Sequence, residues 1–402
     1  GRTDLLMPLG AHLAELVQNR EGTVLRLVGE AGMGKSHLAT QFIQRALDRG
    51  VQVAQGSCQS ITHNNPYFVW RHILFNLLSL EGETEKELID SLSAFIMVQN
   101  PDWMLRLPVL GDLLGLPIPN NPTTAALDND MRQKALYALL VEMGQTLITE
   151  PALFIFENAQ WMDEASQMLL QTVAQQVVAV APLTILMVQR PEPVGNEQVI
   201  GEISELPYYH LLVLKEMPAA EIAALMRVRL GGQLTPLLAA LVQKMTQGNP
   251  FFAGELISAM RQGGQIDQNE RNVWQVSDEL LGLLRRSDFV TQRDGQWQLN
   301  EAVDLSAVKL GIPDSIQGLI LARLDRLPEP HKLTLKVSSV VGHYIDLALV
   351  SLAHPDEKQI AEIESEIRYM EAEEVLDEEV PERLIYVFRH HSLQEVTYDT
   401  LL

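Results

Sequence analysis

Two glycines, a lysine and a serine near the start of the sequence have the spacing of a phosphate-binding motif. Gly29, Gly34, Lys35 and Ser36 match GxxxxGK[ST], and the motif lies between a short apolar run and an amphipathic stretch. Glycine lets successive backbone N–H groups curl around phosphate oxygens, and a helix that starts there directs its positive end at them. Lys35 is expected to reach the β and γ phosphates of ATP or ADP, and the Ser36 hydroxyl is expected to bind Mg²⁺. The expected nucleotide contacts of this loop are Gly29, Ala31, Gly32, Met33, Gly34, Lys35, Ser36 and His37.

Two charged residues follow later apolar runs that read as buried strands. Glu157 follows residues 152–156, and Arg190 comes shortly after residues 183–188. A carboxylate at a strand end can hold Mg²⁺, and an arginine there can make a charge-assisted contact with the γ phosphate. We therefore predict Glu157 as a Mg²⁺ ligand, and Lys35, Glu157 and Arg190 as the catalytic groups.

The residue after Glu157 bears on hydrolysis. It is Asn158, whose neutral amide cannot usefully accept a proton from water. Hydrolysis of ATP to ADP and phosphate is therefore expected to be slow or absent, and the sequence leaves open whether a weak ATPase activity remains.

Alternating strand and helix patterns position these residues. Apolar residues repeat at helical spacing in four segments and form short strand-like runs in five others. The predicted helices are 5–16, 38–47, 67–80 and 131–148, and the predicted strands are 23–28, 51–55, 152–156, 183–188 and 210–214. Such alternation indicates an α/β fold with a parallel sheet covered on both faces, here the sheet of a P-loop NTPase.

The pattern changes near residue 206. The following stretch is mainly helical, with a break at residues 248–250 and a hairpin or turn at residues 294–295. The last part has helical segments, an acidic run at 371–379, a short strand at 384–388 and a final helix after His390. We predict three domains: a nucleotide-binding domain at 1–206, a helical domain at 207–327 and a winged-helix-like domain at 328–402.

Composition narrows the classes of partner. The chain has 402 residues and a net charge of −22, which would repel nucleic-acid and anionic lipid phosphates. No apolar run approaches the ~18 residues that span a bilayer, so we expect a cytoplasmic protein with protein partners and no membrane contact. The single cysteine, Cys58, is expected to be a small buried residue after a strand. We take His63, His72, His354 and His391 as surface or loop residues.

Several landmarks resemble those of the signal-transduction ATPases with numerous domains, the STAND ATPases. Besides the phosphate loop, they are Pro66-Tyr67-Phe68, ENAQWMDEAS from Glu157 to Ser166, QGNPFFAGEL around Gly248 to Pro250, and YVFRHHSLQEVTY near the end. The chain resembles the ATPase module found with bacterial class III adenylate or guanylate cyclases, serine/threonine kinases and LuxR-type regulators. In many relatives the positions of Asn158 and Gln160 hold Asp and His, which again argues against efficient hydrolysis.

The resemblance implies further nucleotide contacts. It places Arg2 near the nucleotide, Arg190 as a sensor arginine, Pro250 on the adenine and His390 on the β phosphate of ADP. It also implies a regulatory switch in which ADP joins the three domains and ATP opens them. Output would then pass to an effector domain or partner protein outside this segment, with nucleotide-dependent oligomerisation as a further implication.

Two other readings remain open. One is an AAA-type DNA-associated ATPase, which would need a basic recognition helix, whereas the final region carries an acidic run. The other is a P-loop kinase acting on a small molecule, which would need a second pocket for the phosphate acceptor.

Overall fold

The computed structural model describes residues 3–58, 65–80, 82, 84–191, 198–293, 295–300, 315–380 and 384–401. Contacts divide the chain into two compact units. The first comprises Gly1–Glu30 and Gly34–Leu214, and the second comprises Ala31–Met33 and Lys215–Leu402. Each unit has an apolar core of its own.

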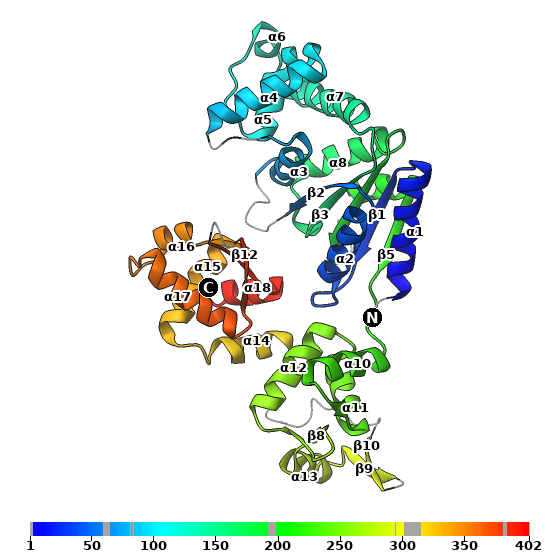
Figure 1. The fold of residues 1–402 in the computed structure, drawn as a ribbon, viewed down its shortest axis with the longest axis vertical. Coiled ribbons are helices and arrows are strands. Elements are labelled where there is room, and N and C mark those ends of the chain that lie inside the picture. Colours follow the sequence, from blue (N-terminus) through cyan, green and yellow to red (C-terminus); the bar gives the residue numbers. More distant parts are fainter. Residues whose placement is uncertain are drawn as a thin grey trace. The chain divides into compact units, whose positions relative to one another are not determined.

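A five-stranded parallel sheet forms the centre of the first unit (Figure 1). Its strands are β1 (Thr23–Val28), β2 (Gln52–Ser57), β3 (Ala152–Glu157), β4 (Leu183–Gln189) and β5 (Tyr209–Val213), in the order β2-β3-β4-β1-β5. Every residue of β4 is buried, as are the first five of β3. Near-continuous burial is typical of parallel strands covered on both faces. The predicted P-loop NTPase sheet is therefore confirmed.

Helices surround this sheet and extend the first unit beyond it. They are α1 (Thr3–Asn19), α2 (Lys35–Leu47), α3 (Phe68–Leu78), α4 (Glu85–Gln99), η2 (Pro101–Arg106), α5 (Leu107–Leu114), α6 (Pro122–Ala125), α7 (Asn129–Leu147), η3 (Ala159–Trp161), α8 (Glu164–Gln176) and α9 (Gln198–Ser204). Trp70 of α3 packs edge-on against Phe154 and Phe156 of β3. In Figure 1, α4 to α7 gather on the far side of α3 from β1. The sequence patterns did not predict α4 to α6.

The first unit extends past the boundary predicted at residue 206. Strand β5 pairs in parallel with β1, and Val28 lies opposite Val213. The backbone N–H of Leu214 also donates to the carbonyl of Val28 at 2.7 Å. Because β5 is hydrogen-bonded to the sheet, the first unit ends at Leu214.

The second unit is mainly helical with short strands. Its first part contains α10 (Ala219–Leu230), β6 (Gln233–Leu234), α11 (Pro236–Thr246), α12 (Pro250–Gln262), β7 (Ile266–Gln268), β8 (Val273–Val276), α13 (Asp278–Arg286), β9 (Val290–Arg293) and β10 (Gln296–Leu299). Strands β9 and β10 are antiparallel partners, which confirms the predicted hairpin. The small sheet β6-β8-β7 was not predicted, because strands of two to four residues have too few positions to show a period.

The last part of the second unit surrounds a three-stranded sheet. It contains α14 (Ile316–Leu324), α15 (Glu329–Val341), β11 (Tyr344–Asp346), α16 (Leu347–Ala353), α17 (Ile360–Ala372), β12 (Leu376–Val380), β13 (Ile385–Phe388) and α18 (His391–Asp399). Its sheet order is β11-β13-β12, with antiparallel pairing throughout. The acidic run leads from the end of α17 into β12. The winged-helix assignment and the division at residue 327 stay predictions.

Two residues discussed from the sequence are buried. Cys58 is 2% exposed, as predicted. His354, predicted as a surface or loop residue, lies in the loop after α16 but is only 3% exposed, and its ring contacts the Thr334 hydroxyl at 3.0 Å. The His354 side chain is buried within the second unit. The position of the residue in a loop did not reveal this burial. His63 lies outside the described residues. Among the helices that the structure describes, none is long and apolar enough to cross a membrane.

Candidate nucleotide-binding site

The predicted phosphate loop connects β1 to α2. Gly32 and Gly34 have φ angles of +76° and +91°, a backbone region that favours glycine. Gly34 is the N-cap of α2, and no side chain in the described part of the chain caps that helix start. The Lys35 ammonium donates to the carbonyls of Gly29 at 2.8 Å and Glu30 at 3.0 Å. An uncapped helix start beside a lysine is suited to bind phosphate oxygens.

Close packing against a neighbouring strand requires a glycine at position 29, in addition to the phosphate-binding motif. A Cβ built on this glycine would lie 2.9 Å from the Cβ of Leu214, the residue after β5. Its backbone N–H donates to the carbonyl of Gln189, at the end of β4, at 3.3 Å. The first glycine of the motif therefore lets the loop leave the sheet close to both neighbouring strands.

The order of the strands brings the loop, the acid and the arginine to one edge of the sheet. Strand β4 lies between β1 and β3. Val28 pairs with Gln189, and Glu157 pairs with Val188. Gly29 and Arg190 therefore lie at the same level and Glu157 two residues before it, at the carboxyl ends of three adjacent strands, which are about 4.8 Å apart. This edge is where open α/β sheets bind ligands.

Polar side chains from neighbouring strands surround Glu157. The Gln55 amide donates to the Glu157 carboxylate at 3.1 Å. The Asn158 amide donates to the Ser57 hydroxyl at 3.3 Å, and Asn158 has a φ of +51°. Asn158 thus connects the end of β3 to β2.

Gln160 has a comparable structural contact. Its side-chain oxygen accepts a hydrogen bond at 3.1 Å from the backbone N–H of Arg190. The contact connects the segment after β3 to the end of β4, and so it holds the backbone of the predicted sensor arginine in place.

Tyr67 and Asp163 join two of the elements on which the family resemblance depends. The Asp163 carboxylate accepts hydrogen bonds from the backbone N–H of Tyr67 at 3.2 Å and from that of Ser166 at 2.9 Å. It also accepts one from the Ser166 hydroxyl at 2.6 Å. Burial, and next the nearby charge of Asp163, raise the pKa of the Cys58 thiol. The Pro66-Tyr67-Phe68 element and the segment after β3 therefore share one buried carboxylate.

Two other predicted contacts belong to the second unit, where they lie close together. Pro250 is the first residue of α12, and the Asn249 side chain caps that helix by accepting from the N–H of Phe252 at 3.1 Å. His390 is the N-cap residue of α18. Its ring packs against Phe251 with centroids 4.3 Å apart and planes at 59°.

The surroundings of His390 favour its neutral form. Loss of solvation lowers the pKa of the imidazole, and Arg389, Arg229 and Arg323 lower it further, whereas Asp377 opposes them. The side chain itself remains exposed to solvent. A neutral imidazole can still donate one hydrogen bond to a phosphate oxygen.

The remaining predicted residues have plainer surroundings. Met33 is buried at 4% exposure, whereas Ser36 and His37 are exposed, and the His37 ring contacts the Gln41 amide at 3.1 Å. Arg2 lies outside the described residues. Sequence reasoning missed Gln55, because its contact with Glu157 depends on the pairing of β2 with β3 and leaves no local signal.

Comparison with known proteins agrees with this geometry. Residues 1–187 match the family described as AAA ATPase domain. A search of curated proteins found no match.

Solved structures with a similar fold include a STAND protein with a tetratricopeptide repeat sensor from Pyrococcus horikoshii. It is 13% identical, with a TM-score of 0.43, and the match covers 97% of this chain and 42% of that protein. The Aeropyrum pernix Orc1 protein in complex with DNA is 12% identical, with 100% and 92% covered and a TM-score of 0.38. Cdc6p from Pyrobaculum aerophilum is 12% identical, with 99% and 93% covered and a TM-score of 0.39.

The chain spans less than half the length of the Pyrococcus horikoshii protein. The phosphate loop, the parallel sheet and the family match agree over the same part of the chain, and we conclude that residues 1–187 form an AAA ATPase domain of the P-loop class.

Proposed function

We propose that this chain is the ATP- and ADP-binding switch module of a STAND-class signal-transduction ATPase. It would control an effector domain or partner protein outside this segment. The observation that carries the proposal is the meeting of the phosphate loop, Glu157 and Arg190 at the carboxyl edge of β1, β4 and β3.

The side chains at this edge suit a nucleotide with Mg²⁺. Lys35 would leave the loop carbonyls for the β and γ phosphates, and Arg190 would contact the γ phosphate. The Ser36 hydroxyl and the Glu157 carboxylate supply the oxygen donors that Mg²⁺ prefers. When bound, Mg²⁺ would neutralise charge on the phosphate oxygens.

Slow hydrolysis suits a switch better than a motor. Asn158 follows Glu157 and donates to Ser57, and a neutral amide is a poor base for activating water. A bound nucleotide then persists, and it shifts an equilibrium only by its different affinities for the two states. Rapid turnover is not needed for that shift.

The second unit supplies the other half of the proposed switch. Pro250 opens α12, and Phe251 beside it packs against His390. ADP held by the first unit would be contacted by Pro250 and His390 in the closed state, and exchange for ATP would release those contacts.

The nucleotide carried by the purified protein tests this proposal. The protein is denatured and its supernatant separated by ion-exchange chromatography, in parallel with Lys35→Ala, His390→Ala and the control His72→Ala, an exposed histidine of α3. We expect near-stoichiometric ADP in the wild type and in His72→Ala, none in Lys35→Ala, and less in His390→Ala. Protein that arrives empty and takes up no added Mg-ATP would refute the nucleotide switch. ADP retained fully in His390→Ala would refute the role of the second unit.

A further inference from the structure

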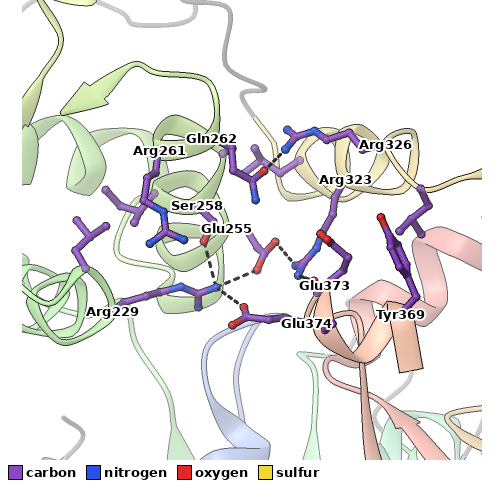
Figure 2. A pocket seen from close by; sticks show the side chains of 16 residues that line it. Arg229, Glu255, Ser258, Arg261, Gln262, Arg323, Arg326, Tyr369, Glu373 and Glu374 are labelled. Carbon is purple, nitrogen blue, oxygen red and sulfur yellow. Dashed lines mark hydrogen bonds and ion pairs between the residues drawn. The ribbon is translucent and has the colours of Figure 1, made fainter. Parts of the chain in front are cut away.

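The second unit contains a cavity of about 500 Å³ that no predicted nucleotide contact lines. Its walls come from α10, from α12, from α14 with the turn after it, and from the end of α17 (Figure 2). The volume falls in the range of small-molecule sites. Charged and polar side chains dominate its lining, which points to a polar ligand.

Arginine is the most frequent charged residue in this lining. Four arginines and three glutamates line the cavity, although acidic residues far outnumber basic ones in the chain as a whole. The arginines are Arg229, Arg261, Arg323 and Arg326. Guanidinium groups bind carboxylates and phosphates through paired N–H donors, so their concentration here favours an anionic occupant.

Glu255 holds one side of the cavity in place. It is 6% exposed on α12, and its carboxylate lies 2.7 Å from the Arg323 guanidinium and 3.6 Å from that of Arg229. A buried carboxylate must be paired to be tolerated. Glu255 therefore serves to position these two arginines, and its own charge is already balanced.

Many of the guanidinium donors are not used by the protein. A guanidinium has five N–H donors. Among the described residues, Arg229 has polar partners at only one terminal nitrogen, and those three contacts are 3.3, 3.6 and 3.5 Å long. Arg326 contacts Gln262 through one nitrogen, and no polar partner of the Arg261 guanidinium is found within the same part of the chain. Charge-assisted hydrogen bonds are usually 2.7–2.9 Å, so an anion could replace the long contacts.

Two arginines of the cavity also act on His390. Arg229 and Arg323, together with Arg389, lower the pKa of the His390 imidazole, whereas Asp377 raises it. The Arg229 guanidinium also lies against the backbone of α12 at Gly254. A Cβ built on Gly254 would lie 2.7 Å from a terminal nitrogen of Arg229. The guanidinium is thus held at the wall of the cavity.

We propose that this cavity binds a small multivalent anion, a compound with two or more phosphate or carboxylate groups, through Arg229, Arg261 and Arg326. This site goes beyond the nucleotide switch and does not depend on it. Glu374 contacts Arg229 at 3.5 Å and Arg389 at 3.2 Å. An anion that binds Arg229 displaces Glu374 from that arginine. Glu374 also contacts Arg389, the residue before His390, so the binding of an anion reaches the surroundings of His390.

Binding of inorganic pyrophosphate and of citrate tests the site. Both anions are titrated by calorimetry into the Lys35→Ala protein without Mg²⁺, so that the phosphate loop is weakened as a competing site. The same titrations are run with Arg261→Gln and Arg326→Gln added together, and with Arg286→Gln, an exposed arginine of α13, as the matched control. The full chain is used throughout.

We expect one molecule of anion to bind and the double substitution to weaken binding about tenfold or more, because two charge-assisted contacts are lost. Arg286→Gln should change the affinity less than about twofold. Tighter binding of pyrophosphate would assign the site to phosphates, and tighter binding of citrate would assign it to carboxylates.

Absence of saturable binding by either anion would overturn the proposal, and so would equal binding by the double variant. Arg261 and Arg326 are both exposed, so the double variant should keep the melting temperature of Lys35→Ala. If it does not, Arg261→Gln alone gives the deciding comparison. Because Lys35 is already replaced, a failure here is distinct from a failure of the nucleotide switch, which is read from bound ADP.

Discussion

The ring of His390 packs against that of Phe251, with centroids 4.3 Å apart, although the two residues belong to distant segments of the second unit. Phe251 is the second residue of α12, and His390 is the N-cap residue of α18. The contact brings the Gly248-Asn249-Pro250 element beside the histidine that the family resemblance places on ADP. It also gives His390 surroundings that can be tested by titration.

The lowered pKa of His390 predicts a dependence of stability on pH. In the folded protein the imidazole stays neutral below its ordinary pKa of about 6.5, whereas in the unfolded chain it takes up a proton. The unfolded state then binds more protons, so this histidine costs stability as the pH falls below about 6.5. His390→Gln should lose less stability than the wild type on acidification.

Melting temperatures measured from neutral to mildly acidic pH check this prediction. His72→Gln, at an exposed position of α3, is the control and should follow the wild type. Parallel curves for His390→Gln and the wild type would contradict the neutral state assigned to His390.

Replacing Asn158 by Asp should speed ATP hydrolysis. Asn158 has a φ of +51°, a conformation that Asp also tolerates, so the backbone need not change. A carboxylate beside Glu157 could act as a base, and we expect turnover to rise about tenfold or more. Phosphate release under saturating Mg-ATP measures it, with Asn158→Ala as the control that should stay at the basal rate. An aspartate variant as slow as the alanine variant would show that another feature limits hydrolysis.

Asp163 should contribute strongly to the stability of the first unit. Its buried carboxylate accepts from Tyr67 N–H, Ser166 N–H and the Ser166 hydroxyl. Asp163→Ala removes a helix cap and leaves buried donors unpaired, which should cost about 2–4 kcal/mol in the free energy of unfolding. Denaturant titration measures this change.

Asp128→Ala is the matched control, since Asp128 caps α7 at an exposed position. Its loss should cost about 1 kcal/mol. Equal costs for the two substitutions would mean that the contact with Tyr67 contributes little.

The Cys58 thiol should be unreactive in the native protein. Burial and the charge of Asp163 raise its pKa, and the thiolate is the form that reacts. Iodoacetamide should modify native protein slowly and denatured protein fully, as read by intact mass. Because Cys58 is the sole cysteine of the sequence, the mass shift is unambiguous. Rapid modification of native protein at neutral pH would disprove this protected state.

The sequence by itself determined the local structure around the phosphate loop. Strand β1 has the predicted bounds, and α2 starts at Lys35 where the motif requires it. Both follow from interactions between residues that are close along the chain. Such residues set the spacing of apolar side chains, the conformations of the glycines and the start of the helix. Glu157 and Arg190 could be proposed for the same reason, since each follows a buried run of one strand.

Only the tertiary structure decided which distant residues meet. The position of β4 between β1 and β3 brings Arg190 to the loop edge, and the pairing of β2 with β3 brings Gln55 to Glu157. Helix α14 contacts both α12 and α18, and His390 at the start of α18 thereby lies on Phe251 of α12. The arginine-lined cavity likewise collects side chains from α10, α12, α14 and the turn after it. Such contacts depend on the folding of whole elements onto a shared core, and a single sequence has no local pattern that records them.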